Sequence, residues 1–294
     1  MKAKRECADK TNPIRGKKLN GTNIYCYCII KKSNDISGAV PKVIIESITG
    51  IDSSCKLYSI SYKDMAMVVS RVSQDEFSEN KLNEVIEDMM WLRKYAVRHE
   101  EIVETLMKRY SPLLPMKFCT IYKDEAHIKM ILEDRYPEFA ETLKFFKDKD
   151  EYGVKVYVER DVFKKKMGTE GTVPKAAEAE DNDISGRNYL LRRKIEKKNQ
   201  EVLITEMSSR GNNIHSIISE WATMSVSNKI VNIGNKTKDE ILVHNTSYLV
   251  DNKYLDRFYH TIKQLNNNYV HEGFRLVTSG PWPPYNFVSS ALAL

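Results

Sequence analysis

Alternating hydrophobic and polar positions mark the strands of this chain. Residues 25–30 are apolar on both alternating faces, a pattern typical of a strand inside a sheet. Residues 56–61 and 65–72 flank a short polar segment and predict a β-hairpin. Further strands are predicted at residues 116–122, 152–159, 229–233, 241–250 and 274–278.

A period of three to four residues marks the helices of the first half. Apolar positions from Leu82 to Tyr110 form one stripe that only His99 interrupts, so a single long helix is predicted there. Residues 124–147 also have a helical pattern, and Pro137 should break or kink that helix. The first half therefore combines strands with at least two helices.

The second half has a more regular order. Helical sequence runs over residues 187–221, with a predicted break near residues 209–211, where glycine and polar residues cluster. A further helix is predicted after Asp251, which can cap its N-terminus. With its strands, this half reads strand, helix, strand, strand, helix, strand, which is the ferredoxin-like order. The predicted fold class is α+β, with a domain boundary near residue 150.

Composition shifts divide the chain into four predicted regions. The N-terminal residues are basic and poor in apolar side chains, and a segment in the second half is rich in glycine and charge, so both are expected to be mobile. The predicted regions are a flexible basic arm (1–22), an N-terminal α+β domain (23–150), a ferredoxin-like domain with a mobile insertion at about 164–185 (151–280), and a C-terminal Pro/aromatic tail (281–294).

The overall charge argues against a nucleic-acid-binding domain. The net charge is +6, but the first 20 residues carry seven basic and two acidic side chains, so the remaining chain is nearly neutral. A duplex-binding domain carries its positive charge on the folded body, because phosphate neutralisation supplies most of its affinity. No segment has the apolar length of a membrane span or of a signal peptide, so a cytoplasmic protein without lipid contact is expected. The five cysteines are expected to be free thiols.

The segment from Gly280 to Val288 has an unusual composition. Three prolines within four residues fix the backbone and cannot donate ladder hydrogen bonds, which predicts a rigid extended segment outside the sheet. Its candidate anchors are Trp282, Tyr285 and Phe287. They either strap the protein's own core or bind another chain, and the strap is favoured because buried aromatic residues more often serve packing.

The catalytic and metal-binding motifs that begin in this sequence are incomplete. His99-Glu100 begins a zinc-protease pattern, but Val103 occupies the position of the second histidine. No G-x-G sequence occurs, which removes a dinucleotide fingerprint. Cys26 and Cys28 would share one face of a strand, but no second pair of ligands accompanies them. We therefore predict no enzyme activity, metal or cofactor, and His99 is interpreted as a core histidine with a backbone or carboxylate partner rather than a ligand or proton-transfer group.

A basic cluster in the second half is a further candidate contact surface. It includes Arg187, Arg192 and Arg193, followed by three lysines. On a helix these residues would spread around the circumference, and acidic residues are interspersed. The cluster is therefore either a solvated helix face or a contact for an acidic partner.

Several short motifs occur in order along the chain. They are Tyr25-Cys26-Tyr27, Gly50-Ile51-Asp52, residues 64–70, His99-Glu100, residues 114–118, residues 152–156, Gly186, Tyr189-Leu190, residues 248–251 and residues 280–285. Together these motifs resemble the gas vesicle protein F/L family. The resemblance covers about residues 24–288, and the terminal proline segment is its most specific part. Cys119 departs from the pattern, since similar sequences usually have glycine there.

The resemblance implies an accessory protein of gas vesicle assembly. Such a protein associates with the small hydrophobic shell protein and with other accessory proteins, and no catalytic activity is implied. The basic arm and the charged insertion lie outside the pattern. The alternative from the residues themselves is a nucleic-acid-binding module, since ferredoxin-like sheets can carry aromatic residues that stack on bases.

Overall fold

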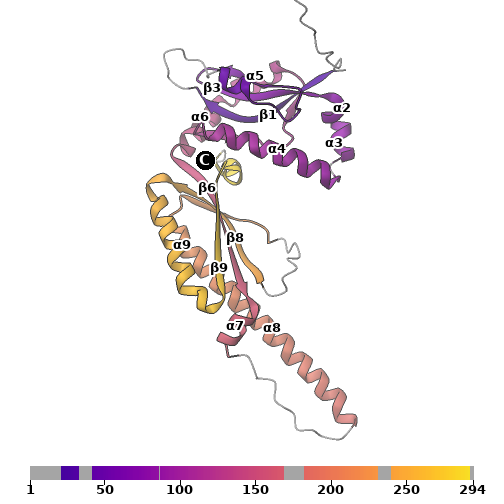
Figure 1. Ribbon diagram of the computed structural model, residues 1–294, viewed down its shortest axis with the longest axis vertical. Helices are drawn as coiled ribbons and strands as arrows, with labels where there is room; N and C mark the ends of the chain where they lie inside the picture. The colour runs from indigo at the N-terminus through magenta and orange to yellow at the C-terminus, as the bar shows by residue number, and fades with distance from the viewer. Residues whose placement is uncertain (1–20, 33–41, 86, 169–181, 231–239, 292–294) are drawn as a thin grey trace, which may run out of the picture.

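The computed structural model describes residues 21–32, 42–85, 87–168, 182–230 and 240–291. The predicted basic arm lies almost wholly outside these residues, as does most of the predicted insertion. Two antiparallel sheets follow one another along the long axis of the molecule, one built by each half of the chain (Figure 1). The fold is therefore a mixture of helices and antiparallel sheet, in agreement with the predicted class.

The first sheet has the order β2-β3-β1-β4, and β5 also pairs with β1. The predicted hairpin is present as β2 and β3. The prediction of one strand over residues 116–122 is wrong. In that region two short strands, β4 and β5, pair with β1, and a turn lies between them. The strands are β1 (Thr22–Lys31), β2 (Leu57–Tyr62), β3 (Met65–Ser73), β4 (Leu113–Pro115) and β5 (Ile121–Tyr122).

A β-bulge in β1 changes which residues face each side of this sheet. The register against β3 shifts between Cys26 and Cys28, so these two cysteines enter different apolar clusters on opposite faces. The prediction that they share a face is therefore wrong, because an extra residue in a strand reverses the alternation beyond it. The four cysteines within the described residues are free thiols, as predicted.

Helices cover both faces of the first sheet. On one face, α4 packs Ile102, Val103 and Leu106 against the sheet, and on the other face α5 and α6 form a second cluster. The single helix predicted from Leu82 onward is wrong, because Asp88 caps α4 by accepting hydrogen bonds from its first turn. The helices are α1 (Lys42–Ser47), α2 (Gln74–Phe77), α3 (Glu79–Val85), α4 (Met89–Met107), α5 (Glu125–Asp134) and α6 (Tyr136–Phe146).

The second sheet has the order β7-β8-β6-β9. Helices α8 and α9 pack against it through one apolar cluster. The strand predicted at residues 229–233 is not present at 229–230, and the rest of that range lies outside the described residues. The elements are β6 (Lys149–Glu159), α7 (Arg160–Lys166), α8 (Asn182–Ser219), β7 (Met224–Ser227), β8 (Glu240–Asp251), α9 (Leu255–Tyr269) and β9 (Phe274–Trp282).

Helix α8 is continuous where a break was predicted. Gly211 faces Val243 and His244 of β8, and an added Cβ would stand 3.4 Å from the Val243 side chain. The glycine thus allows the helix to approach the sheet closely, and the helical hydrogen bonds continue through it. Sequence reasoning mistook a packing glycine for a helix breaker.

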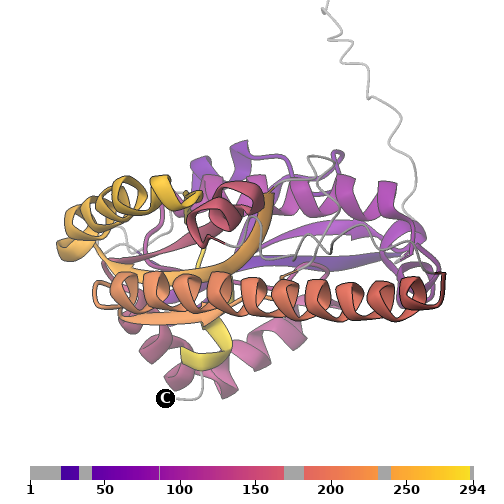
Figure 2. The ribbon, with the colours of Figure 1, turned by 90° about the horizontal axis from the view of Figure 1, so that it is seen from below.

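The C-terminal segment returns from the second sheet to the first half. It consists of a 3-10 turn, η3 (Tyr285–Phe287), and a short helix, α10 (Val288–Ala291). Figure 2 shows α10, in yellow, beside the magenta helices of the first half, and α10 contacts α6. The prediction that the whole proline segment lies outside the sheet is wrong, because β9 continues to Trp282. Gly280 makes this path possible at φ +116°, where an added Cβ would stand 2.8 Å from the Glu151 carbonyl oxygen.

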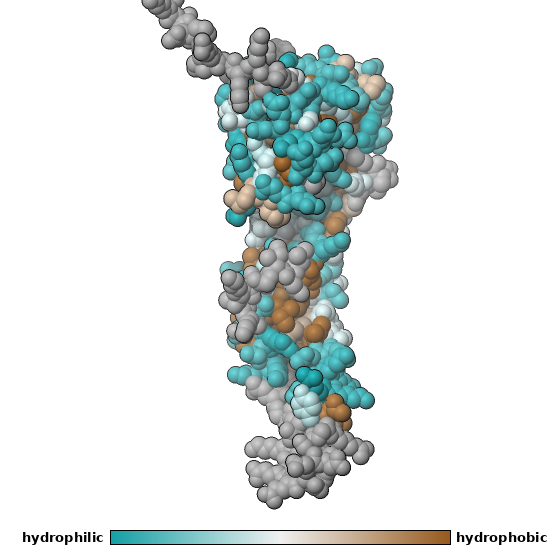
Figure 3. All heavy atoms as spheres, turned by 90° about the vertical axis from the view of Figure 1, so that its right-hand side faces the viewer, coloured by the Kyte–Doolittle hydropathy of each residue, from teal (hydrophilic) through white to brown (hydrophobic). Residues whose placement is uncertain are grey.

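On one side of the molecule, the surface polarity differs between the two halves. On the face seen in Figure 3, hydrophilic residues cover most of the first half, whereas hydrophobic residues gather over the middle of the second half. Among the described residues, no helix combines the length and the apolar character that a membrane span requires.

Candidate interaction groove

A groove of about 450 Å³ lies where α4 meets the C-terminal segment. We call it the α4 groove. One wall is a face of α4, and the opposite wall is formed by the residues around the last two prolines. Its lining residues are Ala96, Val97, Glu100, Glu101, Glu104, Glu151, Trp282, Pro283, Tyr285 and Asn286.

The α4 groove combines an apolar surface with an acidic wall. Val97 is 51% exposed and Trp282 is 38% exposed, so both present apolar surface to solvent at the groove. Glu100 and Glu104 are half-buried and lie one helical turn apart on α4. Neither carboxylate forms an ion pair with a cation of the described residues. The groove therefore offers a ligand both apolar contact and unpaired negative charge.

A tyrosine–histidine–tyrosine chain holds the C-terminal segment against α4. His99 Nδ1 lies 3.0 Å from the Tyr25 hydroxyl, and His99 Nε2 lies 2.9 Å from the Tyr285 hydroxyl. The Cys119 N–H donates to the Tyr25 oxygen at 3.0 Å. Neutral His99 carries one ring N–H, so one ring nitrogen accepts a hydrogen bond and the other donates one, and the tautomer sets which tyrosine hydroxyl is the donor.

The hydrogen bonds to the two tyrosines confirm the interpretation of His99 as a core residue. Its side chain is buried, and burial lowers its pKa to about 4, opposed by a hydrogen bond with the Met116 carbonyl. The Met116 carbonyl is a backbone partner, one of the two predicted alternatives, and the side-chain partners are tyrosine hydroxyls rather than a carboxylate. Cys119 also has a role here, because its φ of +62° is a conformation that glycine adopts without cost, and the backbone there aims its N–H at Tyr25.

A buried carboxylate fixes the other end of the segment. Glu151 of β6 accepts hydrogen bonds from the Asn286 backbone N–H at 3.1 Å and from the Asn286 side-chain amide. The same amide donates to the Ser247 hydroxyl on β8 at 3.1 Å. Burial raises the pKa of Glu151, and the hydrogen bonds from Asn286 oppose that change. The groove wall is thus tied to both central strands of the second sheet.

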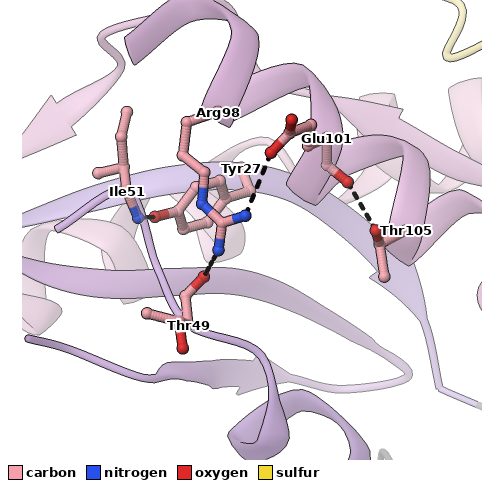
Figure 4. Close-up of polar contacts among 6 residues, drawn as sticks. All are labelled: Tyr27, Thr49, Ile51, Arg98, Glu101 and Thr105. Atoms are coloured by element: carbon pink, nitrogen blue, oxygen red, sulfur yellow. Dashed lines mark hydrogen bonds and ion pairs between the residues drawn. The ribbon is translucent and has the colours of Figure 1, made fainter. Parts of the chain in front are cut away.

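The orientation of α4 depends on contacts at its other side. Arg98 donates to the Thr49 carbonyl at 2.6 Å and pairs with Glu101 at 3.2 Å (Figure 4). Next to them, the Tyr27 hydroxyl accepts the Ile51 N–H at 2.8 Å. These contacts tie α4 to the chain before β2, and because Arg98 pairs with Glu101, Glu100 and Glu104 are the carboxylates that α4 presents to the groove without an ion pair among the described residues.

Ionisation of Glu100 destabilises the native state. Burial, together with Glu104 and Glu151, raises its pKa from 4.5 to about 7. The native state therefore binds more protons than the unfolded state between these values, and stability falls as the pH rises from 4.5 to 7. Glu100→Gln is expected to raise the free energy of unfolding above pH 7 by about 1 kcal/mol, a value discounted for solvent screening of this half-buried group.

The test is urea unfolding of the wild type and the variant above pH 7 and below pH 4.5. The gain should be absent at the lower pH, because Glu100 is then protonated in both states. Glu101→Gln is the matched control, since this neighbouring carboxylate is exposed and paired with Arg98. An equal gain in both variants, or one that does not change with pH, would contradict the assignment.

The structure separates the candidate residues named from the sequence. Trp282 and Tyr285 line the α4 groove, whereas Phe287 is fully buried in an apolar cluster behind it. Arg193 lies far from the groove on α8, with its guanidinium 5.4 Å from the centre of the Tyr189 ring. The side chains of Arg187 and Arg192 lie outside the described residues.

Sequence reasoning missed the acidic wall. Glu100 and Glu104 have the spacing of neighbours on one helix face, which was a readable signal, but Glu151 and Asn286 meet across 135 positions of the chain. Only the fold brings the two walls together.

Comparison with known proteins agrees with the resemblance described above. The model of the gas vesicle synthesis protein GvpL/GvpF family matches residues 23–289. Gas vesicle protein L of a Streptomyces species is 26% identical over 232 residues, covering 79% of this chain and 83% of that protein. Gas vesicle protein L1 of Halobacterium salinarum is 21% identical over 269 residues, covering 90% of this chain and 89% of that protein.

Solved structures of gas vesicle proteins share the fold. The crystal structure of GvpF from Anabaena superposes with a TM-score of 0.62 at 15% identity, covering 91% of this chain and 96% of that one. GvpF from Microcystis aeruginosa gives a TM-score of 0.58 at 14% identity, covering 90% and 98%. Since the family match spans both sheets and the C-terminal segment, the chain belongs to the gas vesicle synthesis protein GvpL/GvpF family.

Proposed function

We propose that this protein is an accessory factor of gas vesicle assembly that binds the hydrophobic shell protein and other accessory proteins, without catalysing a reaction. The observation that carries the proposal is the family match over residues 23–289, which includes the residues on both sides of the α4 groove. On this proposal the protein acts in the cytoplasm and at the gas vesicle.

The α4 groove is the proposed binding surface. Shell subunits that line a gas space must present a large apolar surface, which would aggregate before assembly unless a partner covered it. The exposed surface of Val97 and Trp282 suits an apolar segment of a partner, in the manner of a helix that binds in a groove. The hydrogen bonds of Tyr285 and Asn286 favour a preformed site, so little ordering would accompany binding.

We also propose that the chain forms two domains, with residues 23–150 in the first and a ferredoxin-like second domain over residues 151–280. The strand order β7-β8-β6-β9 and the alternation of strands and helices along the chain support this assignment. The C-terminal segment would then join the two domains. The nucleic-acid alternative gains no support from the groove, because its carboxylates would repel phosphates.

Co-expression with the shell protein tests the proposed function. The wild type is expected to recover shell protein in the soluble fraction as a stable complex, and Val97→Glu is expected to reduce that yield by about tenfold, because a charge in an apolar contact costs more than 1.4 kcal/mol. The matched control is Met130→Glu on α5, a residue of similar exposure on the opposite side of the first sheet.

Two results would count against the proposal. If the folded wild type yields no complex with shell protein, the assembly role through direct binding is wrong. If Met130→Glu lowers the yield as much as Val97→Glu does, binding takes place but the α4 groove is not the site. Circular dichroism of each variant ensures that neither result comes from unfolding.

A further inference from the structure

The N-terminal part of α8 extends beyond the sheet on which the rest of the helix packs. The buried residues of α8 begin at Leu203 and continue to Ile218, and the helix before Leu203 runs past the end of the sheet (Figure 1). We call residues 189–202 of α8 the stalk. A helical segment that packs no face against the protein gains little stability from propensity alone. The stalk therefore has a helix face that no other part of the described residues covers.

Apolar and basic residues share one face of the stalk. Leu190 is 67% exposed, and Lys194 and Lys197 are exposed one and two turns further along. These three residues are spaced i, i+4 and i+7, which places them in a row along the helix. The row presents one large apolar side chain followed by two cations.

A matching row lies on the wall of the α4 groove. Val97, Glu100 and Glu104 are spaced i, i+3 and i+7 on α4, so one apolar side chain is followed by two carboxylates. If the two helices lie parallel, Leu190 meets the apolar surface of Val97 and Trp282. Lys194 then meets Glu100, and Lys197 meets Glu104. Both helices advance about 1.5 Å per residue, so the first and third contacts keep one register and the middle pair is offset by about 1.5 Å, which the long lysine side chain can span.

We propose that the stalk of one molecule docks in the α4 groove of a second copy of this chain. Charge complementarity favours this occupant above pH 7, where Glu100 is ionised, because the groove carboxylates Glu100 and Glu104 have no ion-pair partner among the described residues and the stalk carries cations in a matching row. Within one molecule the stalk and α4 lie toward opposite ends of the long axis, so the contact joins two copies (Figure 1).

The contact would join two different surfaces, which has a consequence for assembly. Each molecule keeps one free stalk or one free groove after pairing, so head-to-tail contacts can continue and form open chains. The stalk and the shell protein would compete for the same groove. Self-association would therefore hold the groove occupied until shell protein displaces the stalk.

The test is analytical ultracentrifugation of the purified full chain over a wide range of concentration, without shell protein. At low salt and above pH 7, where Glu100 is ionised, the average mass of the wild type is expected to increase with concentration and to exceed that of a dimer. The association should weaken near 1 M salt, where the screening length falls to ~3 Å. Because no shell protein is present, the outcome is independent of the proposed function.

Charge reversal gives a second, sharper test. The groove variant Glu100→Lys with Glu104→Lys and the stalk variant Lys194→Glu with Lys197→Glu should each associate at least about tenfold more weakly than the wild type, because like charges then face each other. Mixing the two variants should restore association, since each stalk then meets a groove of opposite charge. The control Lys129→Glu with Lys263→Glu changes the net charge by the same amount as the stalk variant, on exposed residues elsewhere, and should associate like the wild type.

Three results would overturn the proposal. The wild type could remain monomeric throughout, the reversed variants could associate as strongly as the wild type, or their mixture could fail to recover association. A wild type that stops at a discrete dimer would overturn the open-chain arrangement, because two stalk–groove contacts related by a two-fold axis close at two molecules, and the reversed variants would then decide whether the contact exists.

Discussion

Phe287→Ala is expected to lower the free energy of unfolding by about 3 to 5 kcal/mol, as other large-to-small changes in cores do. The Phe287 side chain is 0% exposed. It belongs to an apolar cluster that joins Phe146 of α6 and Leu249 of β8, so its removal leaves a cavity where the two halves of the chain meet. Urea unfolding followed by circular dichroism measures the loss.

Trp282→Ala is the matched variant, and we expect it to cost less than Phe287→Ala, about 1 to 3 kcal/mol. Trp282 is 38% exposed, so a smaller share of its apolar surface is buried than for Phe287, and its indole N–H donates to the nearby Ser279 hydroxyl at 3.1 Å. If Trp282→Ala were as costly as Phe287→Ala, our assignment of Phe287 as the buried anchor and Trp282 as groove surface would be wrong. The strap hypothesis for the C-terminal segment thus rests on Tyr285 and Phe287. Trp282, which was also a candidate anchor, is now interpreted as part of the groove surface.

The sequence predicted the C-terminal segment as a docking element but could not say which aromatic residue docks where. Trp282, Tyr285 and Phe287 lie within six positions and look alike in the local sequence. Which of them is buried depends on the direction in which the chain leaves the second sheet and returns to the first half of the molecule. Gly280 sets that direction through a backbone conformation that is open to glycine. The direction of the chain after the glycine decides that Phe287, and not Trp282, enters the core.

Hydrophobic periodicity found most elements and missed their irregularities. The strands of the hairpin and of β6, β8 and β9 were predicted from alternation, which reports burial directly. The bulge in β1 and the packing glycine of α8 were missed, because both depend on the neighbour across the sheet or the interface. The short strand β7 was also missed, since Met224 to Ser227 has only two apolar positions.

Acid is expected to destabilise the protein through His99. In the native state burial holds the pKa of His99 at about 4, against an ordinary value of 6.5. The unfolded state therefore binds more protons between these values, so the contribution of His99 to stability is complete above pH 6.5 and is lost as the pH falls toward 4. At ~1.4 kcal/mol per pH unit this interval corresponds to about 3 kcal/mol.

His99→Gln isolates this contribution, because glutamine can accept from one tyrosine hydroxyl and donate to the other but does not titrate. Its destabilisation relative to the wild type is expected to be about 3 kcal/mol smaller near pH 4 than above pH 6.5. Glu100 acts with the opposite sign over nearly the same pH range, so the two contributions partly cancel in the wild type. The difference between variants, measured by urea unfolding at both pH values, is the informative quantity.

His260→Gln serves as the control, since His260 is exposed on α9 and its replacement should cost the same at both pH values. If the cost of His99→Gln were also the same at both pH values, protonation of His99 would not be coupled to folding. The two-tyrosine chain would then hold an ionised histidine as well as a neutral one. A cost that changes with pH, by contrast, would tie the closure of the C-terminal segment over α4 to a neutral His99. The wall of the α4 groove that contains Tyr285 would in that case loosen in acid, before the core around Phe287 does.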